Sequence, residues 1–446
     1  MPSIKITELD LTTPGDISTN TNIVYIPGFM TTNSDGWDLD IDGESLSKKA
    51  AKSLTPTLCQ SIYEFEAYFG KKPFMTTPGE GSGEKSEMDM SYLYAKELLN
   101  LGVPVLYESL NSINDETKLE ITTKDALVSK MTDAISNGLY DKLLDRGAYR
   151  FKYLTSGAYP TFTISEDKKS ADASIAAKLL VVAKERGDCM VLVDIESAPD
   201  VTITELHKLV CTQLKNNPDI EFGAVFAPWV NIDCVTHKPS QGDKNITFSM
   251  PGSYAYLSAL GKSLQTNDSW LAVAGVARGQ IPNLNGKNPL EINYTLTNSM
   301  AEGVQNRGKD EALPLSINAI TNISPFGYRI WGNRTLKNNV TDGNLTATSF
   351  LNIRNMICDV KKVVYEACRK YTFEQNNDVL WLNFKSYIEP TLNKMKTGAG
   401  LSGYKIVKGT TNEKAKLVAT IKLYPLYAVE DFEITVQMLD DEISVS

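Results

Sequence analysis

Histidine and cysteine are scarce in this 446-residue sequence, which has two histidines and six cysteines. Ser/His/Asp and Cys/His catalysis both need a histidine base, and neither His207 nor His237 accompanies a GxSxG turn, so nucleophilic hydrolysis is not expected. No two cysteines form a CxxC pair, and most lie in apolar stretches. We therefore predict reduced cysteines in the core and no disulfide framework.

An excess of positive charge and long apolar runs are also lacking. The chain has 45 basic and 54 acidic residues, a net charge of -9, so it has no electrostatic footprint for direct nucleic-acid binding. No run approaches the about 18 apolar residues of a membrane span. The first residues show no basic segment followed by an apolar one, the pattern of a signal peptide. We expect a protein that folds in a cytoplasm and does not insert into membranes.

Three partial ligand motifs each lack a required feature. The acidic turn at 38–49 has no bidentate Glu at the last position of a calcium loop. The Gly-rich segment 79–86 has Glu, not Gly, immediately before its Lys, unlike a phosphate-binding loop. The His–Cys pairs at 207/211 and 234/237 could supply four zinc ligands, but an apolar helix stripe explains the first pair without metal. We expect no metal and no cofactor.

Asp194 and Glu196 follow a predicted strand, which in α/β sheets is a frequent position for catalytic carboxylates. No partner base or nucleophile accompanies them, so a structural turn is the favoured interpretation. A cytoplasmic α/β enzyme that uses these two carboxylates is the alternative. It predicts a ligand-sized pocket at these strand ends.

Strand-like runs alternate with helical patterns between residues 22 and 300, which predicts an α/β body with parallel strands. The predicted helices cover residues 55–68, 91–101, 124–144, 171–186, 203–214 and 252–264, and the predicted strands cover 103–110, 149–153, 190–195 and 222–230. Beyond residue 324 the chain has Asn-rich loops, one strongly patterned helix at 350–370 and two terminal strand-like runs. We therefore place a domain boundary near 300. The chain is predicted to be multidomain, with a smaller α+β domain at 301–446, an N-terminal arm and linker at 1–21, and a C-terminal arm at 431–446.

A series of motifs in the last 125 or so residues resembles contractile tail sheath proteins of bacteriophages and related injection systems. The motifs are FGYRIWGNRTL at 326–336, LNIR at 351–354, FEQNND at 373–378, TGAGLSG at 397–403 and IKLYPLYAVEDF at 421–432. Weaker matches in the body are YEFEAYFG at 63–70, RGD at 186–188, APW at 227–229 and SWLAVAG at 269–275. Residues 111–161 have no counterpart in this pattern, so they are a possible insertion.

The resemblance implies a structural, non-enzymatic protein of a virion tail or extracellular contractile particle. Its copies would form hexameric rings stacked in a helical sheath around an inner tail tube protein, next to baseplate and tail terminator proteins, after assembly in a bacterial host cytoplasm. A non-contractile tail scaffold protein is a further alternative, which would not form long tubes.

The resemblance also implies that terminal strands are exchanged between subunits. The C-terminal arm alternates apolar and polar residues, as a half-buried strand does, whereas the N-terminal pattern is less regular. The predicted inter-subunit residues are Ile4, Ile6, Leu9, Leu11, Phe432, Ile434, Val436 and Met438. The alternative is that the C-terminal strand closes the sheet of its own domain.

The helix at 350–370 has an apolar stripe and a basic face. The stripe consists of Ile353, Met356, Ile357, Val360, Val363, Val364 and Ala367. The basic face consists of Arg354, Lys361, Lys362 and Arg369. Residues 321–410 hold 13 basic and 6 acidic side chains, a net of +7 in an acidic protein. We predict that the basic face contacts an acidic inner tube; the alternative is a solvated helix face.

Overall fold

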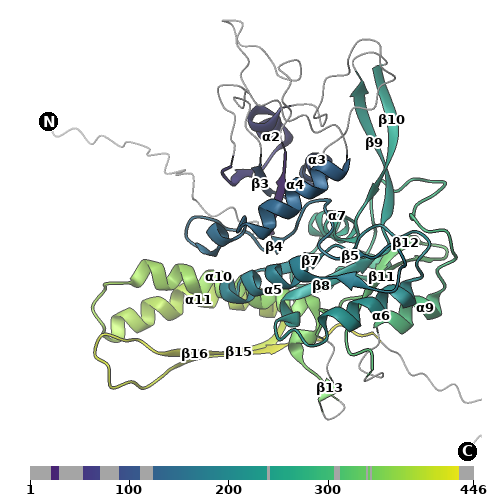
Figure 1. The fold of residues 1–446 in the computed structure, drawn as a ribbon. Helices are drawn as coiled ribbons and strands as arrows, with labels where there is room; N and C mark the ends of the chain where they lie inside the picture. Colours follow the sequence, from purple (N-terminus) through teal and green to yellow (C-terminus); the bar gives the residue numbers. More distant parts are fainter. Residues whose placement is uncertain are drawn as a thin grey trace, which may run out of the picture.

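The computed structural model describes residues 22–29, 54–70, 90–110, 124–238, 242–305, 312–337, 340–341 and 344–430. Its centre is an eight-stranded sheet (Figure 1). The strands, in spatial order, are β12 (Gly327–Trp331), β11 (Asn318–Ile323), β8 (Gly223–Ala227), β7 (Met190–Val193), β4 (Tyr153–Leu154), β1 (Val24–Gly28), β3 (Val105–Ser109) and β2 (Thr57–Cys59).

The strands from β3 to β11 are parallel, and only the edge strands β2 and β12 pair antiparallel with their neighbours. Parallel sheets are covered on both faces, so their strands are continuous apolar runs. Val24 and Ile26 of β1 accordingly join one hydrophobic cluster and Tyr25 joins the other. The predicted α/β class with a parallel sheet is confirmed.

Helices form a layer on each face of the sheet. One cluster includes residues of α2 (Ile62–Phe69), α3 (Met90–Asn100) and α7 (Gly252–Leu264). The other includes residues of α4 (Lys124–Ser136), α5 (Ser174–Arg186), α6 (Ile203–Leu214) and α9 (Asn298–Gln305). Predicted helices at 91–101, 203–214 and 252–264 agree with α3, α6 and α7 to within one residue.

Two regions lie outside these layers. A long antiparallel hairpin of β9 (Val230–Lys238) and β10 (Gly242–Met250) projects from the body (Figure 1). The C-terminal lobe, which we define as residues 344–430, consists chiefly of α10 (Leu351–Tyr371), α11 (Asp378–Thr397) and the hairpin of β15 (Leu401–Lys408) and β16 (Ala419–Pro425). Shorter elements are β5 (Thr163–Ile164), β6 (Ala171–Asp172), α8 (Gly275–Arg278), β13 (Val340–Thr341), β14 (Asn344–Leu345), η2 (Asp141–Leu144), η3 (Ile220–Phe222) and η4 (Ala347–Ser349).

The structure moves the predicted domain boundary. β11 and β12 lie beyond residue 300, yet β11 pairs with β8 and extends the sheet of the body. Among the described residues, the separate hydrophobic cluster of the lobe starts at Ala347 and includes only Trp270 and Leu271 from the body. The prediction of a boundary near 300 is therefore wrong by several tens of residues in the described chain, because a non-local strand pairing adds the later segment to the body.

The described part of the possible insertion at 111–161, residues 124–161, contributes to the sheet and core of the body. β4 lies between β1 and β7 in the middle of the sheet. Met131 and Ile135 of α4 and Phe151 are buried in the core of the body. This part is integral to the sheet because β4, although only two residues long, joins its two halves.

Candidate assembly surfaces

The lobe has its own small core between two helices and a hairpin. Ile353, Met356, Val360 and Ala367 of α10 join a cluster with α11 residues, and partly buried Ile357, Val363 and Val364 pack against it, so the predicted apolar stripe is confirmed. The α11 side chains of this cluster are Phe384, Ile388, Leu392 and Met395. The indole Nε1 of Trp270 donates to the Gly398 carbonyl at 2.8 Å, which ties the end of α11 to the body.

Arg354, the first residue of the predicted basic face, points into the body. Its side chain is 5% exposed, and the guanidinium lies 3.9 Å from the centroid of the Phe222 ring. Its Nη2 is 3.7 Å from Glu221 Oε1. Glu221 is also 3.0 Å from Lys337 Nζ. Arg354 thus holds the first turns of α10 against η3.

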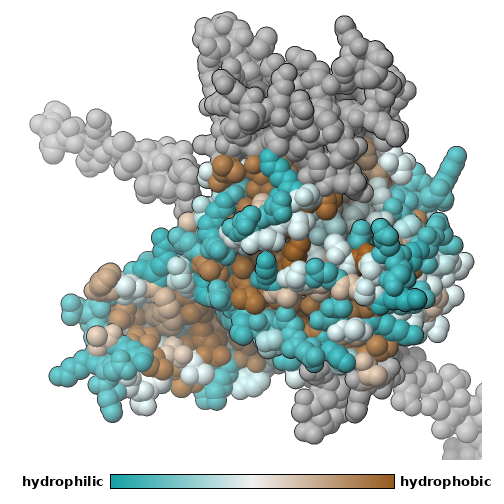
Figure 2. Space-filling view, in the orientation of Figure 1, coloured by the Kyte–Doolittle hydropathy of each residue, from teal (hydrophilic) through white to brown (hydrophobic). Residues whose placement is uncertain are grey.

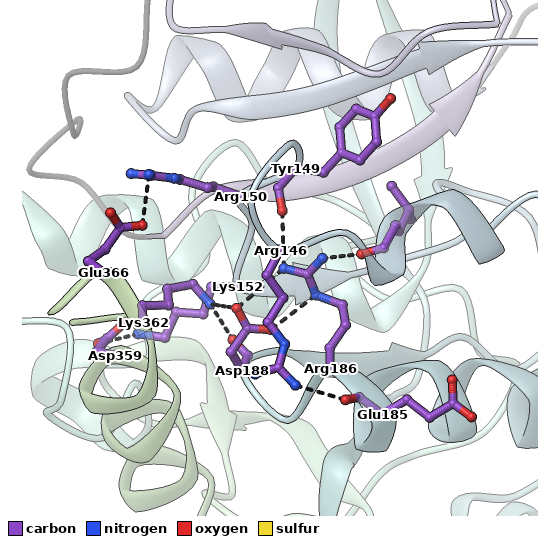
Figure 3. Close-up of polar contacts among 11 residues, drawn as sticks. Arg146, Tyr149, Arg150, Lys152, Glu185, Arg186, Asp188, Asp359, Lys362 and Glu366 are labelled. Atoms are coloured by element: carbon purple, nitrogen blue, oxygen red, sulfur yellow. Dashed lines mark hydrogen bonds and ion pairs between the residues drawn. The ribbon is translucent and has the colours of Figure 1, made fainter. Parts of the chain in front are cut away.

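Lys362 likewise contacts the body, whereas Lys361 and Arg369 are exposed. Lys362 Nζ lies 3.3 Å from Asp188 Oδ2 and donates to the Asp188 carbonyl (Figure 3). Lys361 is partly desolvated by the adjoining body, and this desolvation together with the nearby charge of Arg354 lowers its pKa. Of the four predicted tube-facing residues, two are engaged within the chain and two face outward; contact with a tube stays a prediction.

Further ion pairs join the same side of α10 to the body (Figure 3). Lys152 Nζ lies 2.7 Å from Asp359 Oδ2, and both side chains are almost fully buried. Arg150 Nη2 lies 2.7 Å from Glu366 Oε1. Asp188, the partner of Lys362, is held in turn by Arg186, whose Nε donates to Asp188 Oδ1 at 3.0 Å. Helix periodicity predicted a basic face but could not show that the body contacts Arg354 and Lys362 of it.

The hairpin of the lobe has two free edges among the described residues, since β15 and β16 pair only with each other. Unpaired strand edges are templates for a strand from another chain. The eight residues predicted to form the exchanged arms, at 4–11 and 432–438, lie outside the described residues. Strand exchange is therefore still a prediction, and the free edges are where it would occur.

Large apolar side chains are exposed on the lobe, and Figure 2 shows hydrophobic residues gathered over it. We define the apolar strip as Tyr424, Leu426, Tyr427 and Val429, whose exposed fractions are between 43% and 69%. Large apolar side chains exposed close together in this way are typical of interaction sites. The apolar strip was not predicted from the sequence, although the alternation of side chains in IKLYPLYAV, residues 421–429, could have indicated it.

The two carboxylates of the enzyme alternative both accept hydrogen bonds from other parts of the chain. Asp194 is buried and accepts hydrogen bonds from the Ser253 hydroxyl at 2.7 Å and backbone amide at 3.2 Å. Burial raises its pKa to about 7. Glu196 accepts a hydrogen bond from the Ile164 amide at 2.8 Å. The cavity at these strand ends has a volume of about 20 Å³, roughly one water and far below a small-molecule pocket.

The partial ligand motifs gain no support in the described chain. His207 is buried, and its Nε2 lies 2.8 Å from the Leu315 carbonyl oxygen. No group of three or more potential metal ligands occurs among the residues that the structure describes. The segments 38–49 and 79–86, and the side chains of Cys234 and His237, lie outside them. Within the same ranges, none of the helices has the length and apolar character needed to cross a bilayer.

Comparisons with known proteins agree with the motif resemblance. No protein-family model matches the chain. The tail sheath protein of Vibrio phage KVP40 is 23% identical over 193 residues, 42% of this chain and 26% of that protein. The matched part thus spans about a quarter of this curated relative.

Solved structures show the same fold over nearly the full chain. The sheath complex of the extracellular contractile injection system PVC, in its contracted state, matches with a TM-score of 0.58 and 15% identity. The match covers 99% of this chain and 98% of the PVC chain. A chain of the contracted anti-feeding prophage baseplate matches with a TM-score of 0.61 and 16% identity, covering 98% of each chain. The resemblance to contractile sheath proteins is therefore present in both sequence and fold.

Proposed function

We propose that this protein is the structural subunit of a contractile sheath, which polymerises helically as hexameric rings around an inner tube and contracts to drive the tube through a target cell envelope. The observation that carries the proposal is the fold likeness to a contracted sheath complex, which extends over 99% of the chain. The sequence relative named as a tail sheath protein supports the same role. Such a subunit needs assembly surfaces and no catalytic site.

The lobe supplies surfaces suited to this role. Free edges of β15 and β16 can accept terminal strands of second copies, and main-chain hydrogen bonds at about 0.5–1.5 kcal/mol each would hold neighbours together through large rearrangements. A two-stranded hairpin is marginal by itself, which favours completion by further strands. The principal partner is therefore a second copy of the chain, and a baseplate adjoins the assembly.

An acidic inner tube would contact Lys361 and Arg369, the outward residues of the basic face of α10. A tail terminator would cap the polymer. Assembly takes place in the bacterial host cytoplasm, and the finished particle is a virion tail or an extracellular injection device.

Electron microscopy and light scattering of the protein expressed alone test the proposal. We expect rings or hollow tubes, in the contracted arrangement because nothing else holds an extended one. A stable monomer at high concentration would contradict polymerisation. Short stacks that never lengthen into tubes would favour a non-contractile scaffold protein.

A further inference from the structure

Two of the motifs that carry the resemblance meet in space at an ion pair whose arginine is buried. Arg334 in the segment 326–336 binds Glu430 in the segment 421–432, 96 positions later. Arg334 Nε donates to Glu430 Oε1 at 3.2 Å, and Nη2 donates to Oε2. The Arg334 side chain is 1% exposed. This bidentate pair is the last side-chain contact of the described chain before residues 431–446.

Arg334 is fixed from the side of the body. Its backbone amide donates to Asn318 Oδ1 at 2.7 Å, and Asn318 Nδ2 donates to the Arg334 carbonyl at 2.8 Å. Asn318 is a residue of β11, and its Nδ2 also lies 3.1 Å from the Val225 carbonyl of β8. The guanidinium lies 4.3 Å from the centroid of the Phe350 ring, at the start of α10. Arg334 therefore sits where the sheet of the body meets the lobe.

The segment that ends at Glu430 is held at the same place. The Leu426 amide donates to the Gly400 carbonyl at 3.0 Å. The Tyr427 ring packs edge-on against Phe350, with 5.1 Å between centroids. Leu426 and Val429 nevertheless remain exposed. The contacts thus fix the course of this segment and leave its apolar strip available.

The charge of Arg334 explains why Glu430 must stay in position. A buried guanidinium is tolerated only with an ionic partner and good geometry, and the planar fork of Arg matches a carboxylate in a way that Lys does not. Among the described residues, Glu430 is the carboxylate with which Arg334 forms an ion pair. Because Asn318 holds Arg334 in place, Arg334 determines the position of Glu430.

We infer that Arg334 and Glu430 form an anchor that positions residues 431–446 for insertion into a second copy of the chain. This inference rests on the proposed function. Residues 431–446 carry five acidic residues and no basic ones, whereas the lobe, residues 344–430, carries 13 basic and seven acidic residues, so the two are complementary in charge. A fixed starting point lowers the entropic cost of placing the segment on a neighbour.

The test is Glu430→Gln, which keeps the size of the side chain and removes its charge. We expect a folded protein with a cooperative thermal transition and at least a tenfold loss in tube yield by sedimentation and electron microscopy. The matched control is Glu413→Gln, which neutralises an exposed pair with Lys416 in the same lobe and should assemble as the wild type does. Arg334→Lys keeps the charge but loses the fork, so its yield should lie between these two.

Tubes from Glu430→Gln at the wild-type yield would overturn the anchor and leave the proposed function intact. If the wild type itself forms no tubes, the proposed function fails, and the anchor is tested in the monomer by hydrogen exchange. There, Glu430→Gln should speed amide exchange at residues 426–430 at least tenfold, with β15 unchanged; equal exchange in both proteins would overturn the anchor. If Glu430→Gln does not fold, Glu430→Asp, which keeps the charge but shortens the reach, takes its place in both assays.

Discussion

The body and the C-terminal lobe bury their apolar residues in different ways. The sheet of the body is covered by helices on both faces, and residues of β1 alternate between two hydrophobic clusters. The lobe packs two helices against one two-stranded hairpin and leaves the apolar strip exposed. The described body buries its sheet on both faces, whereas the lobe presents unpaired strand edges and exposed apolar side chains. From this difference we expect stability to reside chiefly in the body and assembly chiefly in the lobe.

Removing the terminal segments should have the largest effect. Deletion of residues 1–15, or of all residues after Glu430, is expected to abolish polymers because the free hairpin edges lose their strands. Negative-stain microscopy and differential scanning calorimetry measure both properties. The cooperative thermal transition of the body should remain.

Tubes formed by both deletion variants would show that the arms do not link the subunits. If only one of the two deletion variants polymerises normally, the arm removed in the other variant links the subunits. Either result would revise the division between a folding body and an assembling lobe.

Breaking the buried pair between the two regions should have the next largest effect. Lys152→Met leaves Asp359 buried without its cation and should cost about 3–5 kcal/mol of unfolding free energy. Urea denaturation measures this loss. Adding Asp359→Leu should recover most of it, because an apolar pair replaces the ion pair.

The matched control for this pair is Glu413→Gln, which removes an exposed pair within the lobe and should leave the urea midpoint unchanged. Equal midpoints for Lys152→Met and the wild type would mean that the body and α10 are not coupled through this contact.

The pH acts on the body through Asp194. Burial raises its folded-state pKa from 3.8 to about 7, so the folded state binds the proton more tightly than the unfolded state. This contribution to stability is fully present below pH 3.8 and is lost as the pH rises to about 7. Asp194→Asn cannot ionise, so its stability relative to the wild type should increase over this range by a few kcal/mol at most.

Urea midpoints measured at intervals from pH 4 to pH 8, a range of about four units around the expected transition, test this prediction. Parallel curves for Asp194→Asn and the wild type would mean that Asp194 ionises alike in both states.

Charge reversal on the outer side of the lobe should have the smallest effect on stability. Lys361→Glu with Arg369→Glu alters exposed side chains, so the thermal midpoint and sheath-only tubes should persist while co-assembly around the inner tube is lost. Wild-type co-assembly should weaken as salt rises. Lys362→Glu is unsuitable because it would place a negative charge beside Asp188.

The control for tube contact is Lys414→Glu with Lys416→Glu, which reverses the same number of charges at the far turn of the hairpin. Tube-filled assemblies from the variant at positions 361 and 369 would remove α10 from the proposed tube contact.

The body was more predictable from the sequence than the lobe. Apolar runs that alternate with amphipathic helices predict a parallel sheet, and α3, α6 and α7 of the body were located to within one residue, as was α10 alone among the two long helices of the lobe. β4 and the pairing of β11 with β8 were not predictable, because one is two residues long and the other depends on distant segments. α11 was missed because its interior contains Pro390 and its stability comes from packing on α10.

The candidate surfaces, too, could be predicted from the sequence only in part. Periodicity identified the basic face of α10, but only the fold shows that Asp188 and Glu221 occupy part of it. Likewise, the sequence contains Arg334 and Glu430 without any indication that they meet.

The Arg334–Glu430 pair also defines a path for mechanical load. In the proposed assembly, a pull on residues 431–446 would act on Glu430, whose carboxylate is linked through Arg334 to Asn318. Asn318 lies on β11, beside β8, so this link would pass part of the tension directly to the hydrogen-bonded ladder of the large sheet, while the backbone passes the rest into β16 of the lobe. The pair would thus divide the load between the two regions of the molecule.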